Sequence, residues 1–178
     1  MHPHAVNDPA LAAMTRPEAE PGPAPLPVRT QRQRPGPAIR DTTLMLGPLD
    51  TAPGDARATL RLALKVWGLP QLTEDVDTIT SELVTNAVIA SRDKAPEGAE
   101  PVAVTLRATV ESGELRIRVW DPDPTPPPGE ALPGDDAESG RGLFIVNALS
   151  SRWGWYPAPN GGKFVWSALS LDTLPPDD

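Results

Sequence analysis

Cysteine is absent from this 178-residue chain, and it contains only two histidines. Without cysteine there is no disulfide and no thiolate metal site, a composition that fits a reducing compartment. The histidines are His2 and His4, at the very start of the sequence. A core site built on histidine, such as a Ser-His pair or a histidine-ligated metal, is therefore not expected.

Long apolar segments are missing as well. No apolar run approaches the roughly 20 residues that a membrane-spanning helix needs, and the first residues lack the basic and apolar regions of a signal peptide. We therefore expect a cytoplasmic protein with no membrane partner. The formal net charge is -8 and the sequence pI is about 4.7. Because an acidic domain repels phosphate backbones, direct nucleic-acid binding is not expected either.

The distribution of proline divides the chain into three parts. Residues 1–37 hold nine prolines and very few large apolar residues. Such a stretch cannot bury enough surface to offset the entropy cost of ordering. We therefore predict a disordered tail over residues 1–38, with either no role or a docking role. One folded domain is expected over residues 39–171, and an acidic tail over 172–178.

Hydrophobic periodicity predicts an α+β domain. The expected elements are an edge strand at 42–46, helices at 55–67 and 73–91, a hairpin of 102–110 with 115–120, a helix at 143–149, and a hairpin of 153–156 with 163–169. Gly68 and Pro70 should end the first helix, and Thr73 is the expected N-cap of the second. The layout predicts a two-layer α/β sandwich, in which helices cover one face of a mainly antiparallel sheet.

The first chemical motif is Ser81-Glu82-Leu83-Val84-Thr85-Asn86 in the second predicted helix. Glu82 and Asn86 are four residues apart, so their side chains point the same way. One interpretation is that both are solvated at the margin of the buried stripe. In the functional interpretation, Asn86 offers its carbonyl oxygen to Mg²⁺ and Glu82 accepts a proton from an attacking hydroxyl.

The second motif is Asp121, which ends a predicted strand just before a proline-rich loop. Its carboxylate could accept a hydrogen bond from the exocyclic amine of adenine, or it could simply start an Asx turn before Pro122. Residues 122–139 hold six prolines. A loop of this length inside a compact domain is usually functional or disordered.

The third motif is Gly140-Arg141-Gly142, which leads into the helix that starts near Leu143. Glycines let backbone amides approach phosphate oxygens, and a helix N-terminus favours anions. The alternative is a flexible loop end beside a helix cap. Lys163 follows two glycines and is expected to be a solvated turn residue rather than a ligand.

Together the three motifs resemble the ATP-binding domain of the GHKL (Bergerat-fold) superfamily, which includes DNA gyrase, histidine kinases and MutL. The chain is most similar to its anti-sigma-factor serine kinase branch, the RsbW/SpoIIAB type of actinobacteria. Residues 82–88 resemble the N box, and Asp121 with Pro126 resembles the adenine-binding box. Gly140, Arg141, Gly142 and Leu143, with the helix that follows, resemble the phosphate box.

The resemblance implies ATP and Mg²⁺ as cofactors. It makes Glu82 the catalytic residue, Asn86 the Mg²⁺ ligand and Asp121 the adenine-binding residue, under a lid formed by residues 122–139. It also implies two protein partners, a STAS-domain anti-anti-sigma factor that is phosphorylated on Ser or Thr and a sigma factor that is sequestered, and it leaves a homodimer open. The alternative is a non-catalytic nucleotide-binding regulator of the same fold.

Two positions depart from the family pattern. Ala90 stands where histidine is frequent, and Asp123 stands where glycine or serine is usual. Asp123 adds a negative charge near the expected base, which would weaken nucleotide binding. A hydrolase or a sensor-kinase fragment fits less well, since the sequence shows no substrate histidine and no dimerising helix pair.

Overall fold

The computed structural model describes residues 40–127 and 141–172. Its strands are β1 (Arg40–Leu46), β2 (Val104–Glu111), β3 (Glu114–Asp121), β4 (Arg152–Pro157) and β5 (Lys163–Ser170). Its helices are α1 (Ala52–Trp67), α2 (Thr73–Asp93) and α3 (Arg141–Leu149), with a 3₁₀ turn, η1 (Pro70–Leu72), before α2. The predicted N-terminal tail, residues 173–178 of the predicted C-terminal tail, and residues 128–139 of the predicted lid lie outside the described residues.

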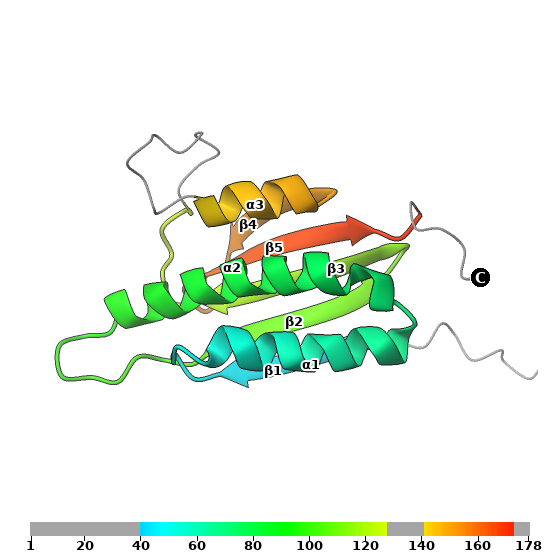
Figure 1. Ribbon diagram of the computed structural model, residues 1–178. Helices are drawn as coiled ribbons and strands as arrows, with labels where there is room; N and C mark the ends of the chain where they lie inside the picture. Colours follow the sequence, from blue (N-terminus) through cyan, green and yellow to red (C-terminus); the bar gives the residue numbers. More distant parts are fainter. Residues whose placement is uncertain (1–39, 128–140, 173–178) are drawn as a thin grey trace, which may run out of the picture. The chain divides into compact units, whose positions relative to one another are not determined.

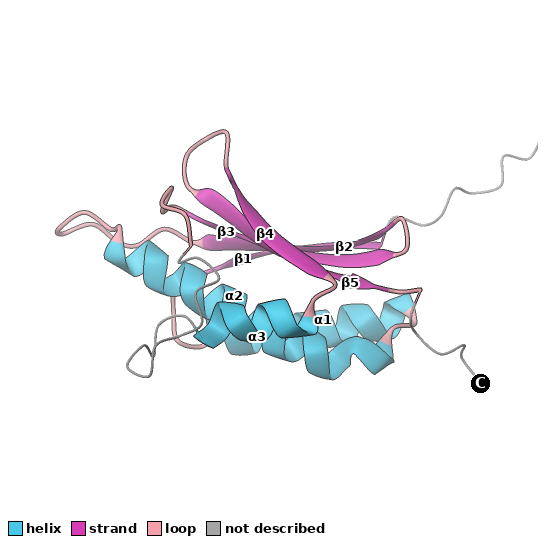
Figure 2. Cartoon of the chain, turned by 90° about the horizontal axis from the view of Figure 1, so that it is seen from above, coloured by secondary structure: helices cyan, strands magenta, loops and turns pink. Residues whose placement is uncertain are grey.

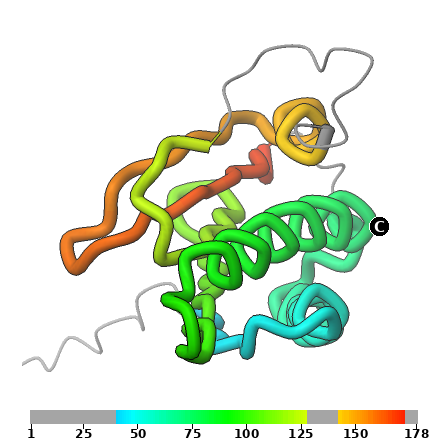
Figure 3. Tube along the Cα trace, turned by 90° about the vertical axis from the view of Figure 1, so that its left-hand side faces the viewer, coloured from blue at the N-terminus to red at the C-terminus, as the bar shows by residue number. Residues whose placement is uncertain are grey.

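The five strands form one antiparallel sheet in the order β1-β2-β3-β5-β4. The helices form a second layer on one face of this sheet, with α2 between α1 and α3 (Figure 1). The views from above and from the side show the same two layers (Figures 2 and 3). The α+β sandwich predicted from the sequence is confirmed. None of the described helices is long and apolar enough to cross a membrane.

The connection between α1 and α2 matches the prediction at one end and differs at the other. Gly68 adopts the left-handed conformation, with φ 73°, and closes α1 as expected. The prediction of Thr73 as N-cap is wrong. Thr73 has helical angles, φ -58° and ψ -44°, because η1 leads directly into α2. Its hydroxyl donates to the carbonyl of Pro70 at 2.6 Å instead of capping an amide.

Helix α2 holds the centre of the core. Val76, Ile79 and Leu83 of the predicted stripe are buried, whereas Ala90 is only half-buried. The buried face is wider than predicted, since it also contains Thr80, Val84, Val88 and Ser91. This width follows from the position of α2, which packs on both neighbouring helices and on the sheet. The exposed edge of the helix is left for Glu82 and Asn86.

The ends of β3 and β5 meet beside α2. Asp121, the last residue of β3, pairs in register with Lys163, the first residue of β5. Gly162, with φ 76°, makes this close approach possible. A Cβ atom at Gly162 would lie 2.1 Å from the backbone oxygen of Asp121, so a side chain there would force the strands apart.

Candidate functional site

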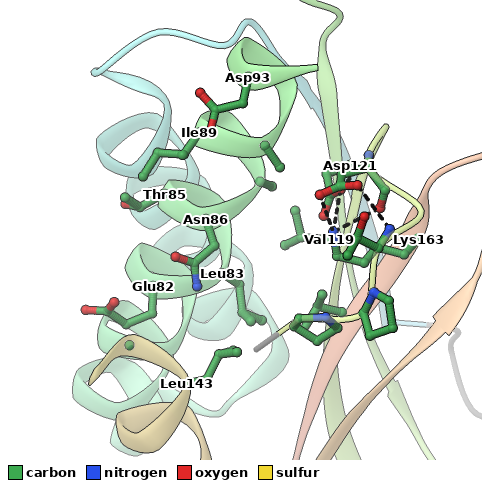
Figure 4. A pocket seen from close by; sticks show the side chains of 18 residues that line it. Glu82, Leu83, Thr85, Asn86, Ile89, Asp93, Val119, Asp121, Leu143 and Lys163 are labelled. Atoms are coloured by element: carbon green, nitrogen blue, oxygen red, sulfur yellow. Dashed lines mark hydrogen bonds and ion pairs between the residues drawn. The ribbon is translucent and has the colours of Figure 1, made fainter. Parts of the chain in front are cut away.

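A pocket of about 540 Å³ opens between α2, the ends of β3 and β5, and the start of α3. This volume lies within the range of small-molecule sites. Every predicted site residue whose side chain or glycine is described lines it: Glu82, Asn86, Asp121, Pro126, Gly142 and Leu143. Figure 4 shows Glu82 and Asn86 on successive turns of α2, across from Asp121 and Lys163 on the strands.

Asp121 lies at the end of the pocket formed by the sheet and is 3 % exposed. Its Oδ1 accepts hydrogen bonds from the backbone amide of Asp123 and from Lys163 Nζ, both at 2.9 Å. The first of these is the Asx turn of the structural interpretation. Because both described bonds end on Oδ1, Oδ2 remains for a ligand. Burial raises the pKa of Asp121 above its ordinary value, and the ion pair with Lys163 opposes that rise.

Asp123, the acidic residue expected to weaken nucleotide binding, forms ion pairs with lysine side chains. Lys94 Nζ lies 3.2 Å from Asp123 Oδ1, and Lys163 Nζ lies 3.9 Å from Asp123 Oδ2. Burial alone would raise the pKa of Asp123, but hydrogen bonds from Thr125 and Lys94 hold it below its ordinary value. The charge on Asp123 is therefore offset mainly by Lys94, while Lys163 lies closer to Asp121 than to Asp123.

The other end of the pocket belongs to α2. Glu82 is half-buried and Asn86 is exposed. Within residues 40–127 and 141–172, neither side chain has a hydrogen-bond partner. Their polar atoms remain available, which suits groups that contact a ligand. Their position in the pocket wall favours the functional interpretation over simple solvation at the edge of the stripe.

The first turn of α3 packs against Glu82. A Cβ atom at Gly142 would lie 2.3 Å from Glu82 Oε2, so this position needs glycine if the carboxylate is to stay in place. Leu143, 7 % exposed, forms part of the apolar wall. Helix α3 begins at Arg141, two residues before the predicted start, so Gly142 lies inside its first turn. The side chain of Arg141 lies outside the described part, and so does Gly140.

The prediction that Lys163 is a solvated turn residue is wrong. The lysine is 5 % exposed and donates to Asp121 Oδ1 and to the backbone oxygen of Asp123, each at 2.9 Å. Sequence reasoning missed it because the pairing of β3 with β5 joins residues 42 positions apart. The two glycines before Lys163 were the available signal, since Gly162 is what allows the approach.

The comparison with protein families decides the identity of this fold. Residues 49–166 match the model of the histidine kinase-like ATPase domain. This chain belongs to the histidine kinase-like ATPase family. The matched segment contains the whole pocket, from Glu82 on α2 to Val165 on β5. Membership of an ATPase domain family implies nucleotide binding, which makes this pocket the candidate nucleotide site.

Two further comparisons found similar proteins. An uncharacterized protein of Streptomyces coelicolor is 50% identical over 54 residues, which are 28% of this chain and 50% of that protein. The chain therefore spans only half the length of this relative. The crystal structure of the RsbU and RsbW domains of Rv1364c from Mycobacterium tuberculosis matches with a TM-score of 0.53 and 22% identity, over 73% of this chain and 31% of that one. At this identity the likeness establishes the fold.

The donor set of this ATPase-family pocket suits a magnesium ion that comes with a nucleotide. Mg²⁺ prefers oxygen ligands and usually takes one or two from the protein and the rest from phosphates and water. The amide oxygen of Asn86 is such a ligand. No cluster of three or more His, Cys, Asp or Glu residues in the described ranges could hold a metal by itself. The side chains thus fit a metal bound together with phosphates.

Proposed function

We propose that this chain binds Mg-ATP in the pocket and is a serine/threonine protein kinase that regulates an anti-sigma pathway. One observation carries the proposal: a single pocket of about 540 Å³ has an ionisable acceptor, Asp121, at one end and the Glu82/Asn86 pair at the other. An ATP-dependent phosphotransfer needs this separation, with the adenine ring held at one end of the pocket and the phosphates at the other.

Each residue would have one task. Asp121 accepts a hydrogen bond from the amine of adenine through Oδ2, while apolar side chains such as Leu143 and Val119 cover the faces of the ring. Pro126 lines the same region. The backbone amides of Gly142 and Leu143, in the first turn of α3, bind phosphate oxygens. Asn86 ligates the Mg²⁺, which neutralises charge on the phosphates when it is bound.

Glu82 acts as the general base. Its carboxylate accepts the proton of a Ser or Thr hydroxyl as that oxygen attacks the γ-phosphorus. A new O–P bond forms, the bond to the β-γ bridging oxygen breaks, and ADP leaves with the bonding electrons. Because Glu82 is half-buried and has no described partner, its carboxylate is free to approach a hydroxyl that enters from outside the pocket.

The protein that receives the phosphate would be a STAS-domain anti-anti-sigma factor. The chain would also sequester a sigma factor. The alternative is a nucleotide-dependent switch that captures its partner without phosphorylating it. The engagement of Asp121 Oδ1 by Lys163 favours neither, because Oδ2 is sufficient for one hydrogen bond to adenine.

The test has two stages. Calorimetry with Mg-ATP should show saturable binding, and absence of heat at high micromolar nucleotide would exclude the ATP site. Purified protein is then incubated with Mg-ATP and STAS-domain proteins of the same genome, and their intact masses are measured. Addition of one phosphate to a partner supports the kinase. Capture of a sigma factor with no phosphate transfer to any STAS protein would establish the non-catalytic switch.

A further inference from the structure

The end of the pocket at Asp121, where adenine is proposed to bind, is called the base end below. It contains a buried ammonium group that the proposed reaction does not use. The Lys163 side chain is 7 % exposed and that of Asp121 is 4 % exposed. Lys163 Nζ joins two adjoining parts of the chain, the Asp121 carboxylate at the end of β3 and the backbone oxygen of Asp123 in the following loop. Lysine is almost never this buried without a partner.

A buried ion pair joins two strands only at a large cost in desolvation free energy. Moving two charges out of water costs several kcal/mol for each ion, and replacing a buried pair with apolar residues of similar volume is often neutral or stabilising. The strands are already joined by the regular β3–β5 ladder next to Asp121. The position of the pair is informative, because both residues line the pocket rather than the core between helices and sheet.

We propose that Lys163 is a positioning residue of the adenine-binding end of the pocket, whose ammonium is the counter-charge of the buried Asp121 carboxylate and engages its Oδ1, so that Oδ2 is presented to the adenine amine. The inference rests on the proposed nucleotide function. In this arrangement Lys163 acts through Asp121, and the hydrogen bond to Asp123 fixes the direction from which the ammonium approaches. A neutral residue at position 163 would leave a buried carboxylate with no counter-charge.

Two charged groups act directly on Asp121, Lys163 and Asp123, and two more lie on the α2 side of the same region. Lys163 comes from β5, Asp123 from the loop after β3, and Asp93 with Lys94 from the end of α2. Burial already raises the pKa of Asp121, and Lys163 is the group that lowers it most. Lys94 pairs with Asp123 instead. Removing Lys163 should therefore raise the pKa of Asp121, whereas removing Lys94 should leave it nearly unchanged.

The first measurement needs no nucleotide. The side-chain carboxyl of Asp121 is followed by carbon-13 NMR as a function of pH in the full chain, in the wild type and in the variants K163M, K163Q and K94M. We expect the midpoint to move to higher pH in K163M and K163Q and to stay in place in K94M. An unchanged midpoint in folded K163M and K163Q overturns the inference, whatever the nucleotide does.

The second measurement follows ATP affinity between pH 6 and pH 9. Wild type and K94M should show a flat profile. K163M should lose affinity by about tenfold for each pH unit below its raised midpoint, and D121N should bind weakly at every pH. K163Q keeps donor groups but no charge, so recovery of a flat profile in K163Q would show that charge is not the cause. If the wild type binds no ATP, the proposed function fails, and the carboxyl titration still decides the role of Lys163.

Discussion

The two ends of the pocket are built differently. At the base end, Asp121 and Lys163 are buried, paired with each other and bonded to the backbone of the next loop. At the phosphate end, Glu82 and Asn86 stand on one edge of α2, half-buried and exposed, with no hydrogen-bond partner among the described residues. Folding alone pairs the polar groups of the base end, whereas those of the phosphate end have no partner among the described residues.

This difference has a physical reason. Buried polar groups must be satisfied within the protein, so the base end is part of the folded structure and its changes should affect stability. Groups at the solvent boundary keep their hydration until a ligand replaces it, so changes at the phosphate end should affect binding and chemistry while the fold stays intact. Variants at the two ends of the pocket should therefore separate loss of stability from loss of function.

Breaking the buried ion pair should give the largest loss. Asp121→Ala removes the nearest counter-charge of the buried Lys163 ammonium and leaves it only the backbone oxygen and the more distant carboxylate of Asp123. We expect a loss of about 3–5 kcal/mol in the free energy of unfolding. The double variant D121L/K163M replaces both charges by apolar groups and should lose much less than the single variant. Urea unfolding of the three proteins measures this coupling.

An exposed ion pair provides the matched control. Arg92 pairs with Asp50 at 2.8 Å, and Asp50 is 92% exposed. Asp50→Ala should change the free energy of unfolding by no more than about 1 kcal/mol. If Asp121→Ala lost no more free energy of unfolding than Asp50→Ala, the base end would not be a part of the site that folding itself forms.

The next effect in size concerns the glycine turn before β5. Gly161 and Gly162 both have positive φ, 94° and 76°, so alanine is strained at either position. Only at Gly162 would the new Cβ atom meet backbone atoms, whereas at Gly161 nothing lies within 4 Å. We expect Gly162→Ala to cost about 1–3 kcal/mol more than Gly161→Ala, the range of overpacking. Equal losses in thermal unfolding would show that the backbone relaxes without disturbing Asp121.

A smaller effect on stability is expected at Gly142, where the new Cβ atom meets the end of a flexible side chain. Gly142→Ala should turn the Glu82 carboxylate aside at a cost of about 1 kcal/mol, offset in part by the better helix propensity of alanine. Gly54→Ala, near the start of α1, gains the same propensity and has only Arg57 at 3.8 Å. Phosphate transfer should fall in Gly142→Ala and stay at the wild-type rate in Gly54→Ala. Equal rates would mean that the position of Glu82 is unimportant.

The same division explains what the sequence could predict. Helix periodicity placed Glu82 and Asn86 on one edge of α2, because residues four apart always share a face. The two hairpins and the strand ending at Asp121 followed from local alternation and turn residues. Lys163 and Gly162 were misread or overlooked, since their roles depend on which strands pair, and β5 joins β3 from 42 residues away. Thr73 was misplaced because a 3₁₀ turn supplied the start of α2.

The smallest effects on folding should come from the phosphate end itself. Glu82→Gln and Asn86→Ala change groups that are half-buried or exposed and have no described partner, so each should alter the free energy of unfolding by no more than about 0.5 kcal/mol. Their effects on function should differ. Asn86→Ala removes a metal ligand and should weaken Mg-ATP binding, whereas Glu82→Gln keeps shape and polarity and should leave affinity nearly unchanged.

The loss in Glu82→Gln should appear in the rate of phosphate transfer, which falls by about 10²–10⁴-fold when a general base is removed. Glu111→Gln is the control, because Glu111 is an exposed residue at the far end of β2 and does not line the pocket. Single-turnover transfer from ATP to the partner, measured beside calorimetry, separates rate from affinity. If Glu82→Gln transfers phosphate as fast as Glu111→Gln, Glu82 is not the general base of the reaction. If it unfolds as readily as Asp121→Ala, the contrast between the two ends of the pocket is wrong.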